Sequence, residues 1–149
     1  MSELLPLDQE LLSKTKKNTE YLSLNGQEFD AKIVHIYDGD TMHVVFFAFG
    51  EYYRWNCRIQ GVDTPELRTK NAYEKKIGYQ VRDILRTLLL NKVVRIRCYD
   101  FDKYGRLLID VYIPDQIPNK HNSETLSAWL IANSYAYEYH GGTKQSWGP

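Results

Sequence analysis

Hydrophobic and polar positions along this chain predict a mainly β domain. Five short runs are rich in β-branched and aromatic residues, and several alternate apolar with polar positions, which is typical of strands with one buried face. The runs are residues 29–36, 42–49, 52–59, 93–99 and 107–113. We therefore expect five strands.

Two further segments have the three- and four-residue apolar spacing of amphipathic helices. The longer segment, residues 71–91, separates the third and fourth strands, and its apolar positions are Ile77, Val81, Ile84, Leu85 and Leu88. The shorter segment, residues 122–133, offers Asn122 or Ser123 as N-cap. Its expected buried residues are Leu126, Trp129 and Leu130.

This order of elements predicts an α+β, mainly β fold class. Five short strands with a helix between strands 3 and 4, followed by a short C-terminal helix, favour a five-stranded OB-fold barrel. Such small closed sheets commonly bind oligonucleotides on one face. The fold alone assigns no function.

The chain has 149 residues, which fits a single domain. We expect the domain to span residues 29–140, with an extension at 1–28 and a tail at 141–149. In the extension, Leu7, Leu11 and Leu12 follow Pro6 with helical spacing. A short helix that packs on the domain is one interpretation of this segment, and an arm that binds a partner is the other.

Charge and composition exclude several functional classes. Nineteen basic and nineteen acidic residues give no net charge, so any site for a polyanion must be local. We expect Cys57 and Cys98 to be reduced core residues, because two thiols form no disulfide framework. No segment resembles a membrane span or a secretion signal. We therefore expect an intracellular monomer with no obligatory protein partner, unless a signal has been removed.

Three turns carry side chains that could do chemistry, although each has an ordinary structural interpretation. Asp38-Gly39-Asp40 could simply be a hairpin turn. In residues 58–67, Asp63 or Thr64 could be the N-cap of a helix, with Pro65 and Glu66 in its first turn. Residues 100–108 could be a hairpin in which Gly105 has a positive φ.

Taken together, the three turns contain what phosphodiester hydrolysis requires. Asp40 and Asp63 are oxygen ligands suited to Ca²⁺ or Mg²⁺. Glu66 could orient or deprotonate a water molecule. Arg58 and Arg106 offer permanently charged, two-pronged donors to a phosphate group. A metal-dependent phosphodiesterase is therefore our first hypothesis.

The joint order of these motifs resembles the staphylococcal nuclease (thermonuclease) family. The motifs are DGDT at 38–41, R-x-x-x-V-D-T-P-E at 58–66 and DKYGR at 102–106. The resemblance implies that Asp40 and Asp63 bind one Ca²⁺ with the carbonyl of Thr64, supported by Asp38. Mg²⁺ is the alternative ion. Glu66 is then similar to the family's water-activating carboxylate, and Arg58 and Arg106 to its phosphate-binding arginines.

The same resemblance implies the substrate and the residues that contact it. Lys103 and Tyr104 match residues that hold a terminal phosphate, and Tyr137 and Tyr139 match tyrosines beside the nucleotide. The family hydrolyses DNA and RNA with little sequence specificity and leaves 3′-phosphate ends. The alternative is a catalytically inactive OB-fold module that only binds nucleic acid, as occurs among the nuclease-like domains of Tudor staphylococcal nuclease proteins.

Two expectations concern the C-terminal part of the chain. Tyr135, Tyr137 and Tyr139 alternate, so an extended backbone would place their rings on one face for base stacking, or they could cover the barrel's rim. Family members commonly continue into a C-terminal helix, which residues 140–149 are too short and glycine-rich to form. Either the chain is shortened, or Trp147 and the N-terminal leucines cover the surface that such a helix would hide.

Overall fold

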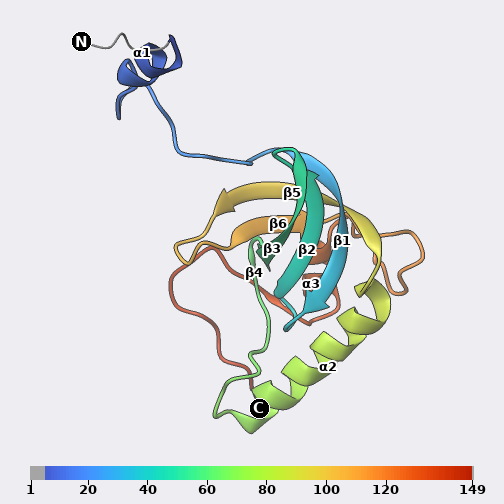
Figure 1. Cartoon of the computed structure of the whole chain (residues 1–149). Coiled ribbons are helices and arrows are strands. Elements are labelled where there is room, and N and C mark those ends of the chain that lie inside the picture. Colours follow the sequence, from blue (N-terminus) through green and yellow to red (C-terminus); the bar gives the residue numbers. More distant parts are fainter. Residues whose placement is uncertain (1–5, 149) are drawn as a thin grey trace.

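The computed structural model describes residues 6–148, and five of its strands form a closed barrel (Figure 1). These strands are β1 (Glu28–Ile36), β2 (Thr41–Ala48), β3 (Glu51–Ile59), β5 (Val93–Phe101) and β6 (Leu107–Val111). They close in the order β1-β2-β3-β6-β5, with β3 and β6 parallel and every other pair antiparallel. The five expected strands and the OB-type, mainly β architecture are confirmed.

The barrel interior forms the hydrophobic core. Its fully buried side chains alternate along the strands, as in β2, where Met42, Val44 and Phe46 point inward. Cys57 and Cys98 are buried in this core and form no disulfide. Burial raises the pKa of the Cys98 thiol to about 11, so the thiol is protonated and inert at neutral pH.

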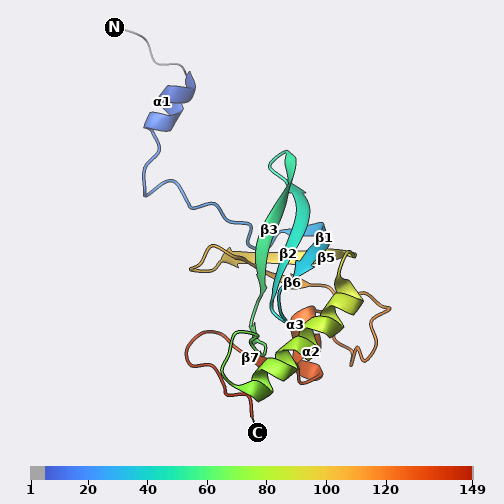
Figure 2. The same ribbon diagram turned by 60° about the horizontal axis from the view of Figure 1, so that its bottom comes forward.

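Helix α2 (Ala72–Leu89) lies along one side of the barrel (Figure 2). Its N-cap is Asn71, whose side chain accepts a 3.1 Å hydrogen bond from the amide of Glu74. Val81, Leu85 and Leu89 are its buried apolar residues, while Ile77, Ile84 and Leu88 pack at the edge of the core. The helix interpretation of residues 63–66 is wrong, because the helix begins only after Asn71.

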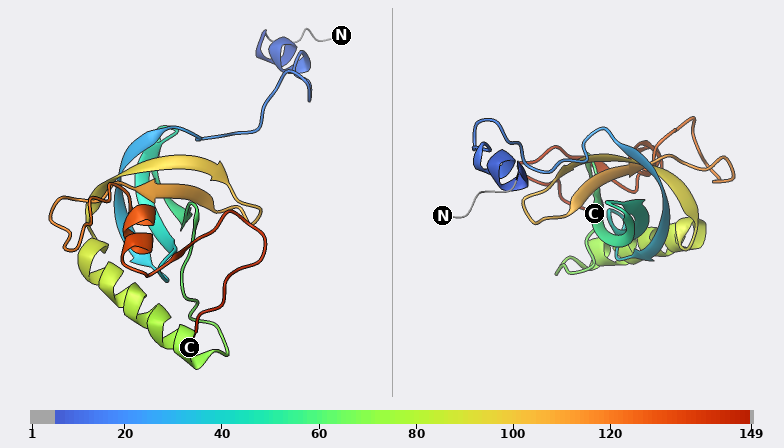
Figure 3. Two further views of the ribbon diagram at one scale, coloured as in Figure 1. Left: turned by 180° about the vertical axis from the view of Figure 1, so that it is seen from behind. Right: turned by 45° about the horizontal axis from the view of Figure 1, so that its top comes forward.

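Helix α3 (Leu126–Ala132) packs beside the barrel, as seen from behind in Figure 3. Leu126, Trp129 and Leu130 are buried, as the sequence predicts. The N-cap is Thr125 and not Asn122 or Ser123. The reason is local: Asn122 adopts a left-handed φ of 58°, and the chain becomes helical only after Thr125 pairs with Tyr112 of the barrel.

A buried carboxylate fastens α3 to β6. Asp110 accepts hydrogen bonds from the amide of Ser127 at 3.1 Å and from the amide of Val111 at 2.9 Å. The hydroxyl of Ser127 also donates to it. Burial raises the pKa of Asp110, although these donors oppose the shift.

A small second sheet joins distant parts of the chain. Strand β4 (Val62–Asp63) pairs antiparallel with β7 (Tyr137–Glu138), and the amide of Tyr139 donates to the carbonyl of Gly61 at 2.9 Å. The sequence pattern did not predict this sheet, because two-residue strands are too short to show periodicity.

The N-terminal helix α1 (Pro6–Leu12) has no buried residue and lies apart from the barrel (Figures 1, 2 and 3). Leu7, Leu11 and Leu12 are 73%, 68% and 69% exposed, so the expected packing of this helix on the domain is not observed. Leu24, by contrast, belongs to the core. Residues 1–5 of the expected extension lie outside the described residues. Within residues 6–148, no helix is long and apolar enough to cross a membrane.

We predict that Asp110→Ala lowers the free energy of unfolding by about 1 to 3 kcal/mol, because the buried amides of Val111 and Ser127 lose their acceptor. Asp83→Ala is the matched control. Asp83 is an exposed acid on α2 whose ion pair is with Arg82, and its loss should change stability by less than about 0.5 kcal/mol. Denaturant unfolding measures both. Equal effects of the two variants would contradict the fastening role of Asp110.

Candidate active site

The first acidic turn connects β1 and β2 and folds around the side chain of Asp38. Its Oδ1 accepts hydrogen bonds from the amides of Asp40 at 3.2 Å and Thr41 at 2.9 Å. The hydroxyl of Thr41 donates to Asp40 Oδ1 at 3.1 Å. Asp38 and Asp40 are only 8% and 7% exposed, so this segment is more than a solvated hairpin turn.

The second acidic segment packs directly onto this turn. A Cβ atom added to Gly39 would lie 2.8 Å from Cβ and Cγ2 of Thr64, so only glycine fits under that side chain. The amide of Thr64 donates to Asp40 Oδ2 at 3.3 Å. Asp63 and Thr64 are 3% and 1% exposed. The two acidic segments, distant in sequence, therefore meet in the fold.

Burial raises the pKa values of two of these carboxyl groups, Asp38 and Asp63. Burial, together with the charge of Asp40, raises the pKa of Asp38 to about 7. Burial also raises the pKa of Asp63, and the charge of Asp40 adds to that shift, while Lys144 and Arg58 oppose it. A cation beside these carboxyl groups would favour their ionised form and oppose both shifts.

Two arginines lie near the acidic segments, Arg58 on β3 and Arg106 in the turn between β5 and β6. Arg58 Nη2 lies 3.5 Å from Asp40 Oδ2 and donates to the carbonyl of Val62 at 2.9 Å. Arg106 Nε donates to Asp102 Oδ2 at 2.8 Å. Although burial opposes ionisation of Asp102, hydrogen bonds from the amides of Arg106 and Tyr104 and from the Arg106 guanidinium lower its pKa. Asp102 thus holds Arg106 in place.

The turn that carries Arg106 has the expected conformation. Gly105 has a φ of 80°, and its amide donates to the carbonyl of Asp102 at 3.1 Å. The parallel pairing of Arg58 with Leu108 then places this turn beside the strand that carries Arg58.

These groups share one cleft of about 280 Å³. Its walls contain both arginines, both acids of the first turn and the candidate water-activating carboxylate: Asp38, Asp40, Arg58, Glu66 and Arg106. Asp63 lines a separate hollow, which shares Glu66 and Lys144 with the cleft, and its carboxyl group is near enough to Asp40 for their charges to interact. The structure therefore brings together the residues that the sequence predicted as catalytic and metal-binding.

Glu66 is held by two contacts. Its amide donates to Glu74 Oε2 of α2 at 2.9 Å, and its Oε1 accepts from Lys144 Nζ at 3.0 Å. Lys144 Nζ also forms an ion pair with Asp63 Oδ1 at 3.1 Å. Burial opposes protonation of Lys144, but Glu66 and Asp63 outweigh it and raise its pKa, so the ammonium is charged.

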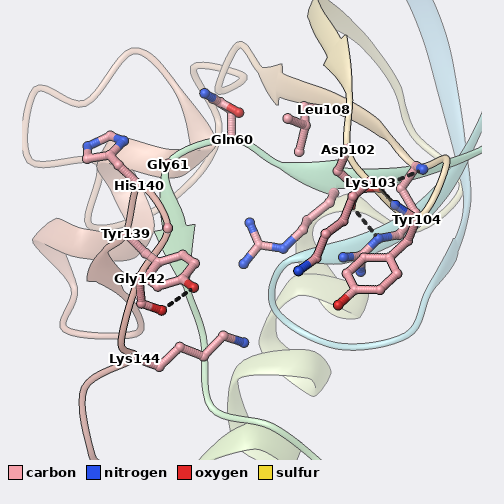
Figure 4. A pocket seen from close by; sticks show the side chains of 13 residues that line it. Gln60, Gly61, Asp102, Lys103, Tyr104, Leu108, Tyr139, His140, Gly142 and Lys144 are labelled. Carbon is pink, nitrogen blue, oxygen red and sulfur yellow. Dashed lines mark hydrogen bonds and ion pairs between the residues drawn. The ribbon is translucent and has the colours of Figure 1, made fainter.

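A second, larger cleft of about 570 Å³ adjoins the first, and Arg58, Arg106 and Lys144 line both. In Figure 4, Lys103 and Tyr104 lie on one side of it, and Tyr139 and Lys144 lie on the other. Tyr104 is 72% exposed. Three of the four predicted substrate-binding residues therefore gather here.

The fourth, Tyr137, does not line this cleft. Its ring packs on Trp147 with 4.3 Å between centroids, while Tyr135 packs on Trp129 at 5.6 Å. The three rings therefore do not offer one stacking surface: Tyr135 lies in a bend before the two-residue strand β7, and Trp147 covers the ring of Tyr137. Of the residues expected to cover the adjoining surface, Trp147 is buried, whereas Leu7, Leu11 and Leu12 are exposed.

The donors suit a hard divalent ion held partly by backbone and water. Thr64 Oγ1 is buried without a hydrogen-bond partner among the described residues, and the buried Asp63 Oδ1 has Lys144 Nζ, at 3.1 Å, as its charged contact. Among residues 6–148, no three His, Cys, Asp or Glu side chains gather as a metal site. Asp40 and Asp63 would therefore need a carbonyl group and water to complete the six to eight oxygen ligands typical of Ca²⁺.

Lys144 was missed by the sequence analysis, which treated residues 141–149 as a tail. The signal that could have indicated it is Gly141-Gly142. Both residues adopt a positive φ, 100° and 84°, and turn the chain back toward Asp63. Gly142, which also lines the larger cleft, was missed for the same reason, whereas Gln60 and His140, which line it too, carry no motif that marks them.

Comparison with known proteins supports the motif-based resemblance. Residues 56–146 match the family described as staphylococcal nuclease homologue, a range that includes Arg58, Asp63, Glu66 and Arg106. An uncharacterized protein of Methanocaldococcus jannaschii is 30% identical over 133 residues, covering 76% of this chain and 60% of that protein.

Two further relatives are named as nucleases. A thermonuclease of Staphylococcus hyicus is 32% identical over 99 residues, covering 64% of this chain and 56% of its own. A micrococcal nuclease of Shigella flexneri is 29% identical over 117 residues, covering 76% of this chain and 62% of its own. This chain thus spans roughly three fifths of the length of these relatives.

We predict that Gly39→Ala lowers the free energy of unfolding by about 1 to 3 kcal/mol, because the added methyl group would push Thr64 off the first turn. Gly148→Ala is the matched control, since a Cβ atom there would meet nothing within 4 Å. Denaturant unfolding distinguishes the two. If Gly39→Ala were as stable as Gly148→Ala, the close contact between the acidic segments would be refuted.

Proposed function

Because the chain belongs to the staphylococcal nuclease homologue family, we propose that it is a calcium-dependent nuclease. It hydrolyses phosphodiester bonds of DNA and RNA with little sequence specificity and leaves 3′-phosphate ends. The observation that carries the proposal is the shared cleft, in which Arg58 and Arg106 line the same space as Asp40 and Glu66.

In this proposal, the carboxylates of Asp40 and Asp63 and the carbonyl of Thr64 hold the ion, with Mg²⁺ as the alternative to Ca²⁺. The support is the burial of Asp40, Asp63 and Thr64 and the raised pKa of Asp63, which burial causes and a bound cation would oppose. A bound divalent ion supplies electrostatic stabilisation of the charge that develops on phosphate oxygens.

Asp38 acts through the backbone in the same proposal. Its Oδ1 accepts from the amides of Asp40 and Thr41, and this contact fixes the turn that presents Asp40. Asp38 is therefore a positioning residue, and its buried side chain needs no direct contact with the ion.

The chain's own residues supply the remaining chemistry. Glu66 lines the cleft and orients the attacking water, from which it can accept a proton. Arg58 and Arg106 donate to the phosphoryl oxygens, whose negative charge grows as the bond to the leaving oxygen lengthens. Arg106 is already oriented by Asp102 through Nε, which leaves its terminal Nη groups directed to a substrate.

The larger cleft supports binding of the nucleotide beside the scissile bond. Lys103 supplies positive charge for a terminal phosphate, and the rings of Tyr104 and Tyr139 supply surfaces on which a base can stack. Stacking depends little on base identity, so it gives affinity without sequence specificity. The proposed role of Tyr137 in substrate binding lacks this support, because its ring lies against Trp147.

The direct test is incubation with single-stranded DNA, duplex DNA and RNA, each with Ca²⁺, Mg²⁺ or chelator, followed by end-group analysis of the fragments. The proposal expects cleavage with Ca²⁺, none with chelator, and 3′-phosphate ends. Tight binding of oligonucleotides without cleavage would instead favour the inactive binding module.

We predict that Glu66→Gln and Arg106→Ala each lower kcat by about 10² to 10⁴, since each removes one proton acceptor or one charge-stabilising donor. Arg95→Ala is the control. Arg95 pairs with Glu28 and Asp30 on the barrel, outside both clefts. Turnover is measured at saturating substrate, with unfolding checked by circular dichroism. Near-normal turnover of both variants would refute the assigned roles.

A further inference from the structure

Lys144 occupies a position that the proposed mechanism does not explain. Its ammonium lies 3.1 Å from Asp63 Oδ1 and 3.0 Å from Glu66 Oε1, between a proposed ion ligand and the proposed water-activating carboxylate. It also lies 5.7 Å from the centre of the Tyr139 ring. Figure 4 shows its side chain extending beside Tyr139.

The fold fixes this lysine from both sides. Before it, the hydroxyl of Tyr139 donates to the carbonyl of Gly142 at 2.9 Å. After it, Trp147 is 7% exposed and packs on Tyr137, and its carbonyl accepts from Asn71 Nδ2 at 2.7 Å. The segment between Gly142 and Trp147, which these two hydrogen bonds hold in place, is short. Lys144 is therefore held beside Asp63 and Glu66 and does not move as freely as an ordinary surface lysine.

At this position, the Lys144 ammonium would compete with a divalent ion for the carboxylate of Asp63. Asp63 is buried, and the Lys144 ammonium is the charged group that contacts its Oδ1 among residues 6–148. A divalent ion on the same carboxylate would repel the ammonium. Glu66 Oε1, in contrast, can keep Lys144 after the ion has bound, because the Glu66 side chain is 49% exposed and free to adjust.

We propose that Lys144 is a positioning residue that competes with the divalent ion for Asp63 and, once displaced from it, holds the carboxylate of Glu66. In the ion-free protein, its single positive charge pairs with both carboxylates, offsets one of their two negative charges and keeps the site assembled. The inference rests on the proposed function, because it assigns Asp63 to the ion and Glu66 to the water.

The test compares Lys144→Met with the wild-type chain by calorimetric titration of calcium without substrate. Lys144→Met removes one positive charge beside the ion. We therefore expect this variant to bind calcium about tenfold more tightly. Lys144→Arg keeps the charge and should bind calcium like the wild type. Lys75→Met is the control for long-range charge. It removes an exposed lysine from the N-terminal end of α2 and should also bind calcium like the wild type.

The second readout is turnover at saturating calcium and substrate. Lys144→Met should lower kcat about tenfold when Glu66 is present and cause no further loss in the Glu66→Gln background, because the two residues then act as one unit. An equal loss in both backgrounds would overturn the positioning of Glu66.

Unchanged or weaker calcium binding by Lys144→Met would overturn the competition for Asp63. If the wild type cleaves nucleic acid and binds calcium while Lys144→Met binds it equally, the inference about Lys144 fails and the proposed function stands. If the wild type neither binds calcium nor cleaves, both are overturned.

Discussion

The contact between Thr64 and Gly39 is the constraint on which the rest of the site depends. The turn after β1 and the segment after β4 can bury their acids together because residue 39 has no side chain to hold them apart. The hydrogen bond from the amide of Thr64 to Asp40 then holds the two segments together. If a methyl group separated these segments, the carboxyl groups of Asp38, Asp40 and Asp63 would become exposed. They would also lie too far apart for one cation to neutralise them.

The barrel supplies the surroundings of this contact. Because the last residues of β3 pair with the first residues of β6, Arg58 lies beside the turn that carries Arg106. The short β4–β7 sheet adds the C-terminal segment, and Asn71 joins that segment to the start of α2. A chain without net charge thus gathers Arg58, Arg106, Lys103 and Lys144 around one pair of adjoining clefts. A polyanion would be attracted locally, as the balanced composition requires.

The sequence predicted the barrel well because its strands are long enough to show alternation and α2 is long enough to show helical spacing. It also indicated the convergence of Asp40, Asp63, Glu66 and both arginines, because motif order carries that information once the family is recognised. The failures were of a different kind. The N-cap of α3 was misplaced because several capping residues stand in succession, and tertiary pairing of Tyr112 with Thr125 selected one of them. Lys144 was missed because its position depends on a pairing of Val62 with Glu138 that no local pattern encodes.

Anomalous diffraction from crystals of the wild-type chain grown with calcium tests the central claim most directly. The account predicts one calcium peak whose distances to carboxylate oxygens of both Asp40 and Asp63 are about 2.3 to 2.6 Å. A peak bound to only one of these residues, or calcium bound elsewhere with this site empty, would contradict it.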